Sequence, residues 1–136
     1  MLTIAVTHEQ ARVPVAVMSL DGELDAASYL EAIETARQLI SDGTAHILLD
    51  LENLSYMGSS GLFVLQSVAM MLRGQAPPDP EGGWGAIHQA AGDQSDSSAH
   101  LKILSPQPQV DRVLDRSGLK RFFETYTDRA EALGSF

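Results

Sequence analysis

Residues 46–74, HILLDLENLSYMGSSGLFVLQSVAMMLRG, are the stretch that decides the fold. Their uninterrupted apolar run at residues 47–49 is typical of a central strand that helices cover. After the serine pair Ser59 and Ser60, apolar residues recur at spacings of three and four, as they do on one face of a helix. The stretch therefore predicts a strand, a short turn and a helix that ends near Arg73, with two hydroxyl groups where the helix begins.

The predicted helix after the serine pair is apolar on more than one face. One face is formed by Leu62, Leu65, Val68, Ala69 and Leu72, and a second carries Phe63, Met70 and Met71. Such a helix is either covered on two sides or presents an apolar patch to a partner. The sequence leaves both interpretations open.

Length and charge limit the classes of function. With 136 residues, 44% of them hydrophobic, the chain has the size of one globular domain. Nine basic residues against 18 acidic ones give a net charge of −9, and no window forms the basic stripe that a nucleic-acid surface needs. We therefore expect no nucleic-acid partner, and the acidic excess favours a partner with a basic face.

Residue types that build metal, redox and membrane sites are missing or poorly placed. The chain has no cysteine, and its four histidines show no i, i+4 spacing, so we expect neither a metal nor another cofactor. The apolar residues 13–20 are interrupted by Pro14 and Ser19, and are shorter than the roughly 20 residues of a membrane span. No basic flank or cleavage site of a signal peptide precedes them, so we expect a cytoplasmic protein without membrane insertion.

The region before the deciding stretch predicts two strands and a helix. Residues 2–7 and 13–20 are rich in strand formers and close enough to pair in an antiparallel fashion. Asp25 is the expected N-cap of the helix, and Gly43 lies at its expected end. The predicted buried face of this helix carries Leu30, Ile33, Ala36 and Ile40.

Residues 74–99 differ in composition from the rest of the chain. They hold three of the six prolines, five of the eleven glycines and no lysine or arginine, which is typical of a loop or a disordered insert. Trp84 and Ile87 are the only large apolar residues in the segment. The insert is therefore either an inert linker or a docking element that these two residues anchor.

After the insert the alternation of strands and helices resumes. Residues 101–104, LKIL, predict a strand, and a helix with Val110, Val113 and Leu114 on one face is expected to end at Gly118. Residues 121–126, RFFETY, predict a last strand, and residues 127–133 a capped terminal helix. The order ββαβα(insert)βαβα predicts a single α/β domain over residues 1–136, with a mixed, mostly parallel sheet of about five strands, about four helices and one antiparallel edge pair.

The residue pattern at the serine corner excludes a hydrolase nucleophile and a P-loop. A hydrolase elbow needs Gly-x-Ser-x-Gly, but here Met57 stands where the first glycine would be required for Ser59. No Gly-Lys-Ser or Gly-Lys-Thr occurs, so a P-loop is absent. We expect no enzyme; the open interpretations are a helix cap formed by Ser59 or Ser60, a generic anion site and a phosphorylation switch.

Three segments resemble the STAS domain family of anti-sigma factor antagonists. DLENLSYMGSSGLFVL, residues 50–65, resembles the family's signature segment, and LDGELDAAS, residues 20–28, resembles its Gly-Glu-Leu-Asp turn before the first helix. SPQPQVDRVLDRSGL, residues 105–119, is similar to the family's third characteristic stretch, a Ser-Pro that opens a helix ending in Ser-Gly-Leu. The three occur in the family's order and cover nearly the whole chain except the insert.

The resemblance implies a switch at Ser59. In such antagonists the first serine of the pair is phosphorylated by a partner serine kinase that is also the anti-sigma factor. The unmodified protein binds this kinase and frees a sigma factor, and the phosphorylated protein is rejected until a serine phosphatase restores it. A phosphate adds a charge of about −1.5 to −2, which a helix N-terminus tolerates but an interface with acidic groups does not.

The resemblance also assigns roles to neighbouring residues. Ser60 and Gly61 would shape the turn at Ser59. Candidate residues of the kinase-facing surface are Gly22, Glu23, Asp25, Leu62 and Phe63, with core packing as the alternative role of Leu62.

One residue of the signature departs from the family pattern. Gly58 stands where the family has an aspartate directly before the serine pair. The missing carboxylate affects recognition by a kinase and the start of the helix more than it affects the fold. The alternative function is therefore a STAS domain that is not phosphorylated and serves as a scaffold or as a subunit of a larger, transporter-associated complex.

Overall fold

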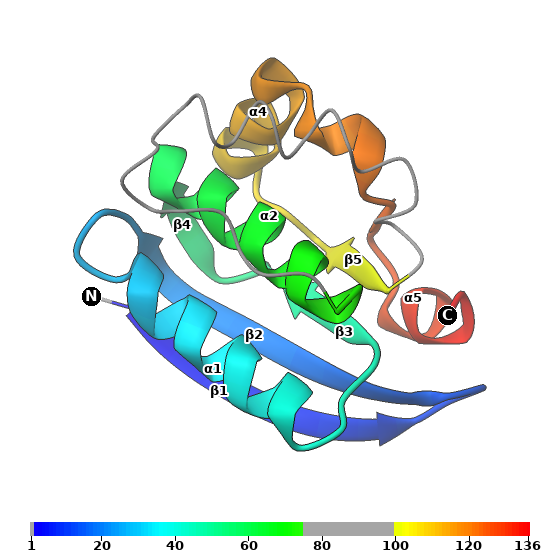
Figure 1. The fold of residues 1–136 in the computed structure, drawn as a ribbon. Helices are drawn as coiled ribbons and strands as arrows, with labels where there is room; N and C mark the ends of the chain where they lie inside the picture. The colour runs from blue at the N-terminus through cyan, green and yellow to red at the C-terminus, as the bar shows by residue number, and fades with distance from the viewer. Residues whose placement is uncertain (1, 75–99) are drawn as a thin grey trace.

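The structure is a computed structural model that describes residues 2–74 and 100–136. The predicted insert, with Trp84 and Ile87, lies outside the described residues apart from Gly74. In chain order the elements are β1 (Leu2–Gln10), β2 (Pro14–Leu24), α1 (Tyr29–Ser41), β3 (Ile47–Asp50), β4 (Leu54–Met57), α2 (Ser59–Leu72), β5 (Leu101–Leu104), α4 (Pro108–Ser117), the 3-10 helix η3 (Leu119–Phe122), β6 (Thr125–Tyr126) and α5 (Arg129–Gly134) (Figure 1). No helix among these residues is both long and apolar enough to cross a membrane.

One mixed sheet organises these elements. Its strand order is β1-β2-β3-β5-β6, with β1 antiparallel to β2 and every other pair parallel. The first part of β2 pairs with β3, and its last residues, Gly22 to Leu24, pair with β4. The predicted α/β fold with an antiparallel edge pair is therefore confirmed, and β3 and β4 follow one another along the same edge of β2.

Two strand predictions were incomplete or wrong. The four-residue β4 was not predicted, because its Ser55 and Tyr56 are exposed and only pairing with β2 fixes it as a strand. Of the predicted strand at residues 121–126, the first two residues belong to the 3-10 helix η3, whose Leu119 is buried in the core, and only the last two form β6. In both places tertiary contacts decide a conformation that local propensity leaves open.

Helix α1 begins later than predicted. Its N-cap is Ser28, and Asp25 instead holds the preceding turn, where its Oδ1 accepts hydrogen bonds from the Ala27 amide (3.0 Å) and the Ser28 hydroxyl (3.1 Å). The prediction that Leu30 is buried is wrong, since 57% of it is exposed. Tyr29 takes the inward position of this first turn. The buried face is formed by Ala32, Ile33, Ala36 and Leu39.

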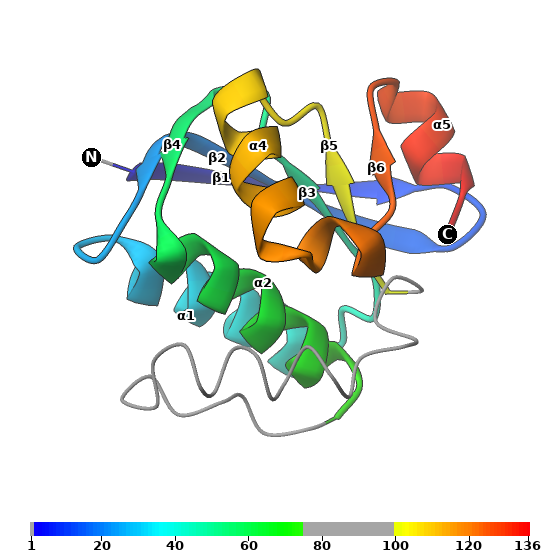
Figure 2. The same cartoon turned by 90° about the horizontal axis from the view of Figure 1, so that it is seen from above.

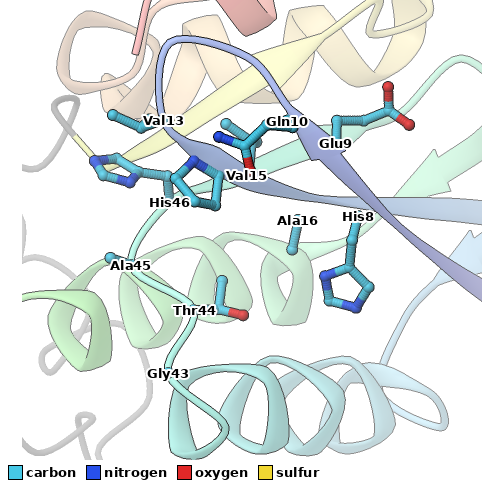
Figure 3. Close-up of a pocket in the computed structure, with 11 residues that line it drawn as sticks. His8, Glu9, Gln10, Val13, Val15, Ala16, Gly43, Thr44, Ala45 and His46 are labelled. Carbon is cyan, nitrogen blue, oxygen red and sulfur yellow. The ribbon is translucent and has the colours of Figure 1, made fainter.

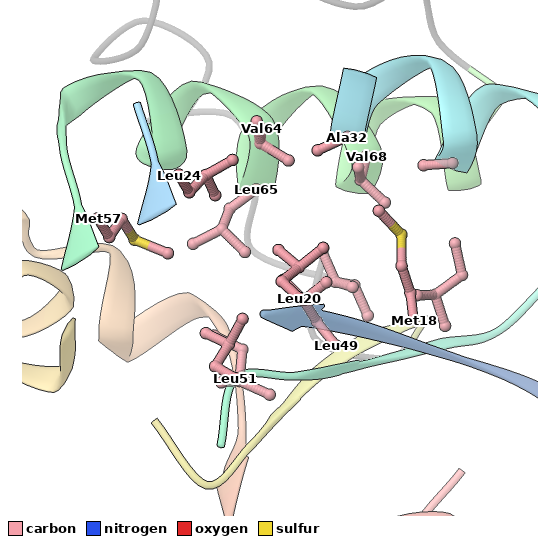
Figure 4. Close-up of a cluster of buried hydrophobic side chains, with 14 of the residues drawn as sticks. Met18, Leu20, Leu24, Ala32, Leu49, Leu51, Met57, Val64, Leu65 and Val68 are labelled. Carbon is pink, nitrogen blue, oxygen red and sulfur yellow. The ribbon is translucent and has the colours of Figure 1, made fainter. Parts of the chain in front are cut away.

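The main core lies between the sheet and the helices α1 and α2. Ala16, Met18 and Leu20 on β2 face these helices, whereas Val15 and Val17 belong to a second cluster on the other face, as expected for a strand with a period of two. Figure 4 shows Val64, Leu65 and Val68 of α2 above the sheet side chains. Helix α2 is buried without a break from residue 61 to residue 69, so it is covered on two sides by the sheet and α1.

Helix α5 covers part of the opposite face of the sheet (Figure 2). The predicted cap is confirmed, because the Asp128 carboxylate accepts from the first amides of the helix. Lys102 Nζ lies 2.7 Å from the Glu124 carboxylate and donates to the Ser135 carbonyl at 2.9 Å. Val15, Val17, Leu48, Leu104 and Ala132 form the cluster beneath.

His46 lies at the edge of this second cluster. Its ring is 5.3 Å from the His100 ring and 5.6 Å from the Phe136 ring. Burial, together with the nearby His100 and Lys102, holds the pKa of His46 below its ordinary value of 6.5. Since the unfolded chain takes up this proton more readily, the contribution of His46 to stability is present above the unfolded pKa and is lost as the pH falls.

We predict that His46→Gln flattens the pH dependence of stability. The free energy of unfolding of the unmodified chain should fall more steeply than that of the variant as the pH decreases below about 6.5. Urea unfolding followed by circular dichroism at several pH values measures the two slopes. Identical slopes in the two proteins would contradict the assignment.

Candidate functional site

The serine corner connects β4 to α2. Gly58 is the N-cap of α2 in an extended conformation (φ −90°, ψ −171°), and Ser59 is the first helical residue. The Gly58 amide donates a 3.0 Å hydrogen bond to the Leu24 carbonyl at the end of β2. This bond brings the turn at residues 20–28 against the serine corner, so two of the three characteristic segments meet here.

Gly22 fastens the end of β2 to the turn before β4. Its φ of 113° lies in the left-handed region that favours glycine, and the β2–β4 register shifts between Gly22 and Glu23. The Gly22 amide donates to the Asn53 carbonyl at 3.1 Å, and the Ser55 hydroxyl donates to the Gly22 carbonyl at 2.9 Å. These contacts give Gly22 a role in building the site.

The third characteristic segment also reaches this corner. Gln107 Nε2 donates to the Glu52 carbonyl at 2.8 Å, and Gln109 Nε2 donates to the Ser55 carbonyl at 3.0 Å. Sequence reasoning did not single out these two glutamines, since their partners lie more than 50 residues away and no local pattern marks them. The start of α4 is thus held against β4, and all three segments surround one site.

Neither serine caps the helix. The N-cap is Gly58, and within the described residues no side chain caps the first amides of α2, so the interpretation of Ser59 or Ser60 as a cap is wrong. Ser59 is exposed and Ser60 is half-buried. The Ser59 hydroxyl is therefore accessible at the positive end of a 14-residue helix, where a negative group is favoured.

The other residues proposed for the partner-binding surface divide into exposed and buried ones. Glu23 is exposed and Asp25 is half-buried. Leu62 and Phe63 are only 2% and 5% exposed, and the Phe63 ring contacts the Tyr29 ring edge-on at 6.0 Å. Both belong to the core. Gly61 is buried as well, with no room for a side chain: an added Cβ would meet Met57 Cγ and would lie 3.1 Å from Leu24 Cδ2.

A groove of about 390 Å³ separates the serine corner from α4. Its walls are Tyr56, Met57, Gly58, Ser59, Leu62, Val113, Arg116 and Ser117. Tyr56 is 52% exposed, and Arg116 is the one basic residue among these walls. Sequence reasoning gave neither residue a role: Tyr56 lies only three residues before Ser59, whereas Arg116 is brought to the serine by the packing of α4 against β4.

A second cavity of about 320 Å³ lies at the other end of the sheet, near the hairpin between β1 and β2. Figure 3 shows His8 and His46 on opposite sides of Ala16 and Thr44, so the two imidazoles do not converge. Nowhere in residues 2–74 and 100–136 do three or more histidine or acidic side chains gather as metal ligands would. The serine corner is therefore the candidate site.

Comparison with known proteins assigns the family. The sequence profile of the STAS domain family matches residues 5–76, more than half of the 136-residue chain. The chain belongs to the STAS family. This match covers the Gly22 turn and the serine corner, which the resemblance of the sequence segments had indicated.

Individual STAS relatives agree with this assignment. An anti-sigma F factor antagonist of Paenibacillus polymyxa is 28% identical over 133 residues, which are 97% of this chain and 92% of the relative. The crystal structure of an anti-sigma factor antagonist from Mycobacterium paratuberculosis has a TM-score of 0.68 at 20% identity, covering 98% of this chain and 92% of the other. The anti-sigma factor antagonist SpoIIAA in its unphosphorylated form has a TM-score of 0.57 at 24% identity, with 94% and 92% covered. The two structures show that the fold is shared.

We predict that Gly61→Ala destabilises the protein by about 1–3 kcal/mol, because the new methyl group overpacks the contact of α2 with Met57 and Leu24. Gly134→Ala is the matched control, since a Cβ there meets nothing within 4 Å. Urea unfolding measures both free energies. Equal stabilities of the two variants would contradict the close packing at Gly61.

We predict that Gly58→Asp stabilises the protein. The extended backbone at Gly58 suits any residue, and the exposed Tyr56 side chain, whose hydroxyl would lie 3.2 Å from the new Cβ, can move aside. The carboxylate can then accept from the uncapped amides of α2. The expected gain in the free energy of unfolding is roughly 0.5 kcal/mol over the unmodified chain and about 1 kcal/mol over Gly58→Ala, which adds a Cβ without an acceptor. A variant with aspartate that is no more stable than the one with alanine in urea unfolding would exclude this capping.

Proposed function

We propose that this STAS protein is an anti-sigma factor antagonist that acts as a phosphorylation-regulated binding module. In this proposal it binds an anti-sigma factor serine kinase and thereby releases a sigma factor. The observation that carries the proposal is the exposed Ser59 hydroxyl at the first residue of α2, joined to the end of β2 by the Gly58–Leu24 hydrogen bond. The names of the relatives support the same role.

Phosphorylation of Ser59 changes the charge of this surface. The kinase transfers the γ-phosphoryl group of ATP to Ser59 Oγ, so that a phosphorus–oxygen bond forms, ADP leaves and a base of the kinase takes the hydroxyl proton. The new group carries about −1.5 to −2 charge, is favoured at the start of α2 and repels acidic groups of a partner. A serine phosphatase reverses the change, and no refolding of the domain is required.

We infer that the contact surface is formed by exposed residues around Ser59. Glu23 of β2 pairs in register with Tyr56 of β4, and both are exposed. The Tyr29–Phe63 contact places the first turn of α1 beside that of α2, where Leu30 exposes 57% of its surface. Glu23 suits a basic residue of the partner, whereas Leu30 and the uncharged Ser59 suit apolar residues or an acidic group, which a phosphate on Ser59 would repel.

The other residues predicted for the partner-binding surface hold its backbone in position. Gly22 and Asp25 hold the turn at the end of β2, whereas Ser60 and Gly61 shape the first turn of α2. Leu62 and Phe63, which are buried, fix the position of that turn through packing.

We further propose that residues 1–136 act as one STAS domain, with residues 74–99 as an insert. The protein is expected to work in the cytoplasm, to lack catalytic activity and to bind no nucleic acid, in keeping with its net charge of −9.

Gly58 favours a second candidate function. Without a carboxylate before the serine pair, the corner lacks a group that the family pattern contains. The second candidate is a STAS domain that is not phosphorylated and serves as a scaffold or a subunit of a larger, transporter-associated complex.

Incubation with the cognate anti-sigma serine kinase and ATP separates the two functions. We expect mass spectrometry to find one phosphate on Ser59, and Ser59→Ala to abolish it. Ser60→Ala is the matched control. It should still be phosphorylated on Ser59, because the Ser60 hydroxyl that it removes is half-buried and is not the proposed acceptor.

Binding to the same kinase provides the second measurement. We expect Ser59→Asp to weaken binding at least tenfold in isothermal titration calorimetry, a loss of about 1.4 kcal/mol, since a negative charge enters the interface. Full binding by this variant together with an unphosphorylated Ser59 would reject the switch and favour the scaffold.

A further inference from the structure

The groove beside Ser59 lies between two segments that are far apart in the sequence, the serine corner and α4. Tyr56, Gly58 and Ser59 form the wall at the serine corner, and Arg116 and Ser117 in the last turn of α4 form the facing wall. The phenolic oxygen of Tyr56 lies beside Gly58, only 3.2 Å from the place where a Cβ of residue 58 would stand. Polar groups from both walls therefore line the space next to the Ser59 hydroxyl.

Arg116 is available for a new partner. Its side chain is exposed and takes part in no ion pair or hydrogen bond within the described parts of the chain. Asp111 on the same helix is occupied by Lys120, whose Nζ lies 2.8 Å from the carboxylate. No acidic residue stands three or four positions from Arg116 on α4, the spacings at which helical side chains pair.

The other polar groups of the facing wall are already used. The Ser117 hydroxyl donates to the Leu114 carbonyl at 2.9 Å and accepts from the Leu119 amide at 3.2 Å, which ends α4. Position 58 brings no carboxylate that would compete for a cation, because it is a glycine. Among the residues that the structure describes, Arg116 is thus the one positively charged group that lines the groove with Ser59.

We propose that Arg116 binds the phosphoryl group of phosphorylated Ser59 across this groove, with the Tyr56 hydroxyl as a second donor. The inference rests on the proposed assignment of Ser59 as the phosphate acceptor. A guanidinium presents paired N–H donors that match two phosphate oxygens, and such bidentate contacts fix the orientation of the phosphate as well as its position.

This contact gives the phosphorylated state a defined surface. The phosphate turns toward α4 and occupies the part of the groove between Ser59 and Arg116. A partner that inserts a side chain between the serine corner and α4 then meets a partly occupied groove in addition to a negative charge. Arg116 acts as a positioning residue of the switch, and its loss leaves the phosphate mobile.

The test uses protein with phosphoserine installed at position 59 during translation, so that no kinase is needed. Titration by phosphorus-31 NMR measures the second ionisation of the phosphate monoester, which has a pKa of about 6 in the absence of a partner. An arginine in contact favours the dianion, so we expect Arg116→Gln to raise this pKa by roughly half a unit at low salt, with a smaller difference at high salt.

Arg112→Gln is the matched control, because Arg112 is exposed on the same helix, carries the same charge and does not line the groove. It should leave the phosphate pKa within about a tenth of a unit, as expected for a charge screened by solvent. Equal values in the two variants would overturn the role of Arg116. If the glutamine variant does not fold, Arg116→Lys, which keeps the charge but loses the bidentate contact, should still narrow the phosphate resonance relative to Arg112→Lys, because the phosphate becomes more mobile; no difference between these two overturns the proposal as well.

The titration and the kinase assay test separate proposals, so a negative result in one does not decide the other. Absence of phosphate on Ser59 after incubation with the kinase overturns the proposed function, whereas equal titrations of the two variants overturn only the contact of Arg116.

Discussion

The 3.0 Å hydrogen bond from the Gly58 amide to the Leu24 carbonyl joins the end of β2 to the start of α2. Strand β4 pairs with the same edge of β2 as β3 does, and Leu24 and Met57 are the last pair of this parallel contact. The hydrogen bond lies directly after that pair, where the chain enters α2. The position and direction of the first turn of α2 depend on it. The position of the accessible Ser59 is therefore fixed by a backbone hydrogen bond between two segments that are far apart in the sequence.

Packing against α2 makes this arrangement rigid. The helix is buried from residue 61 to residue 69, and its close approach to Met57 leaves no room for a side chain at Gly61. A close-packed interior has low compressibility and resists displacement. In the proposed function, a phosphate on Ser59 would therefore alter charge and shape at the corner while the core beneath it stays unchanged.

The two ends of the sheet serve different purposes. At the end where the parallel strands finish, glycine turns, an accessible hydroxyl and a groove form a surface suited to binding. At the opposite end, Lys102 holds the C-terminal part of the chain through Glu124 and Ser135, beside the neighbouring rings of His46 and His100. Ser59 is exposed, whereas the ammonium group of Lys102 is paired with Glu124 and Ser135 and stabilises the fold.

The sequence by itself determined most of the strand and helix order and the place of the serine corner, because apolar periodicity and glycine positions are local properties of the chain. The resemblance of three segments indicated the family. It misassigned the N-cap of α1 and the burial of Leu30, which depend on how Tyr29 packs against α2. Only the tertiary structure showed that β4 is a strand and that Arg116 faces Ser59 across a groove. Both follow from contacts between segments separated by about 30 residues or more, and loop closure of that length leaves no pattern in the local sequence.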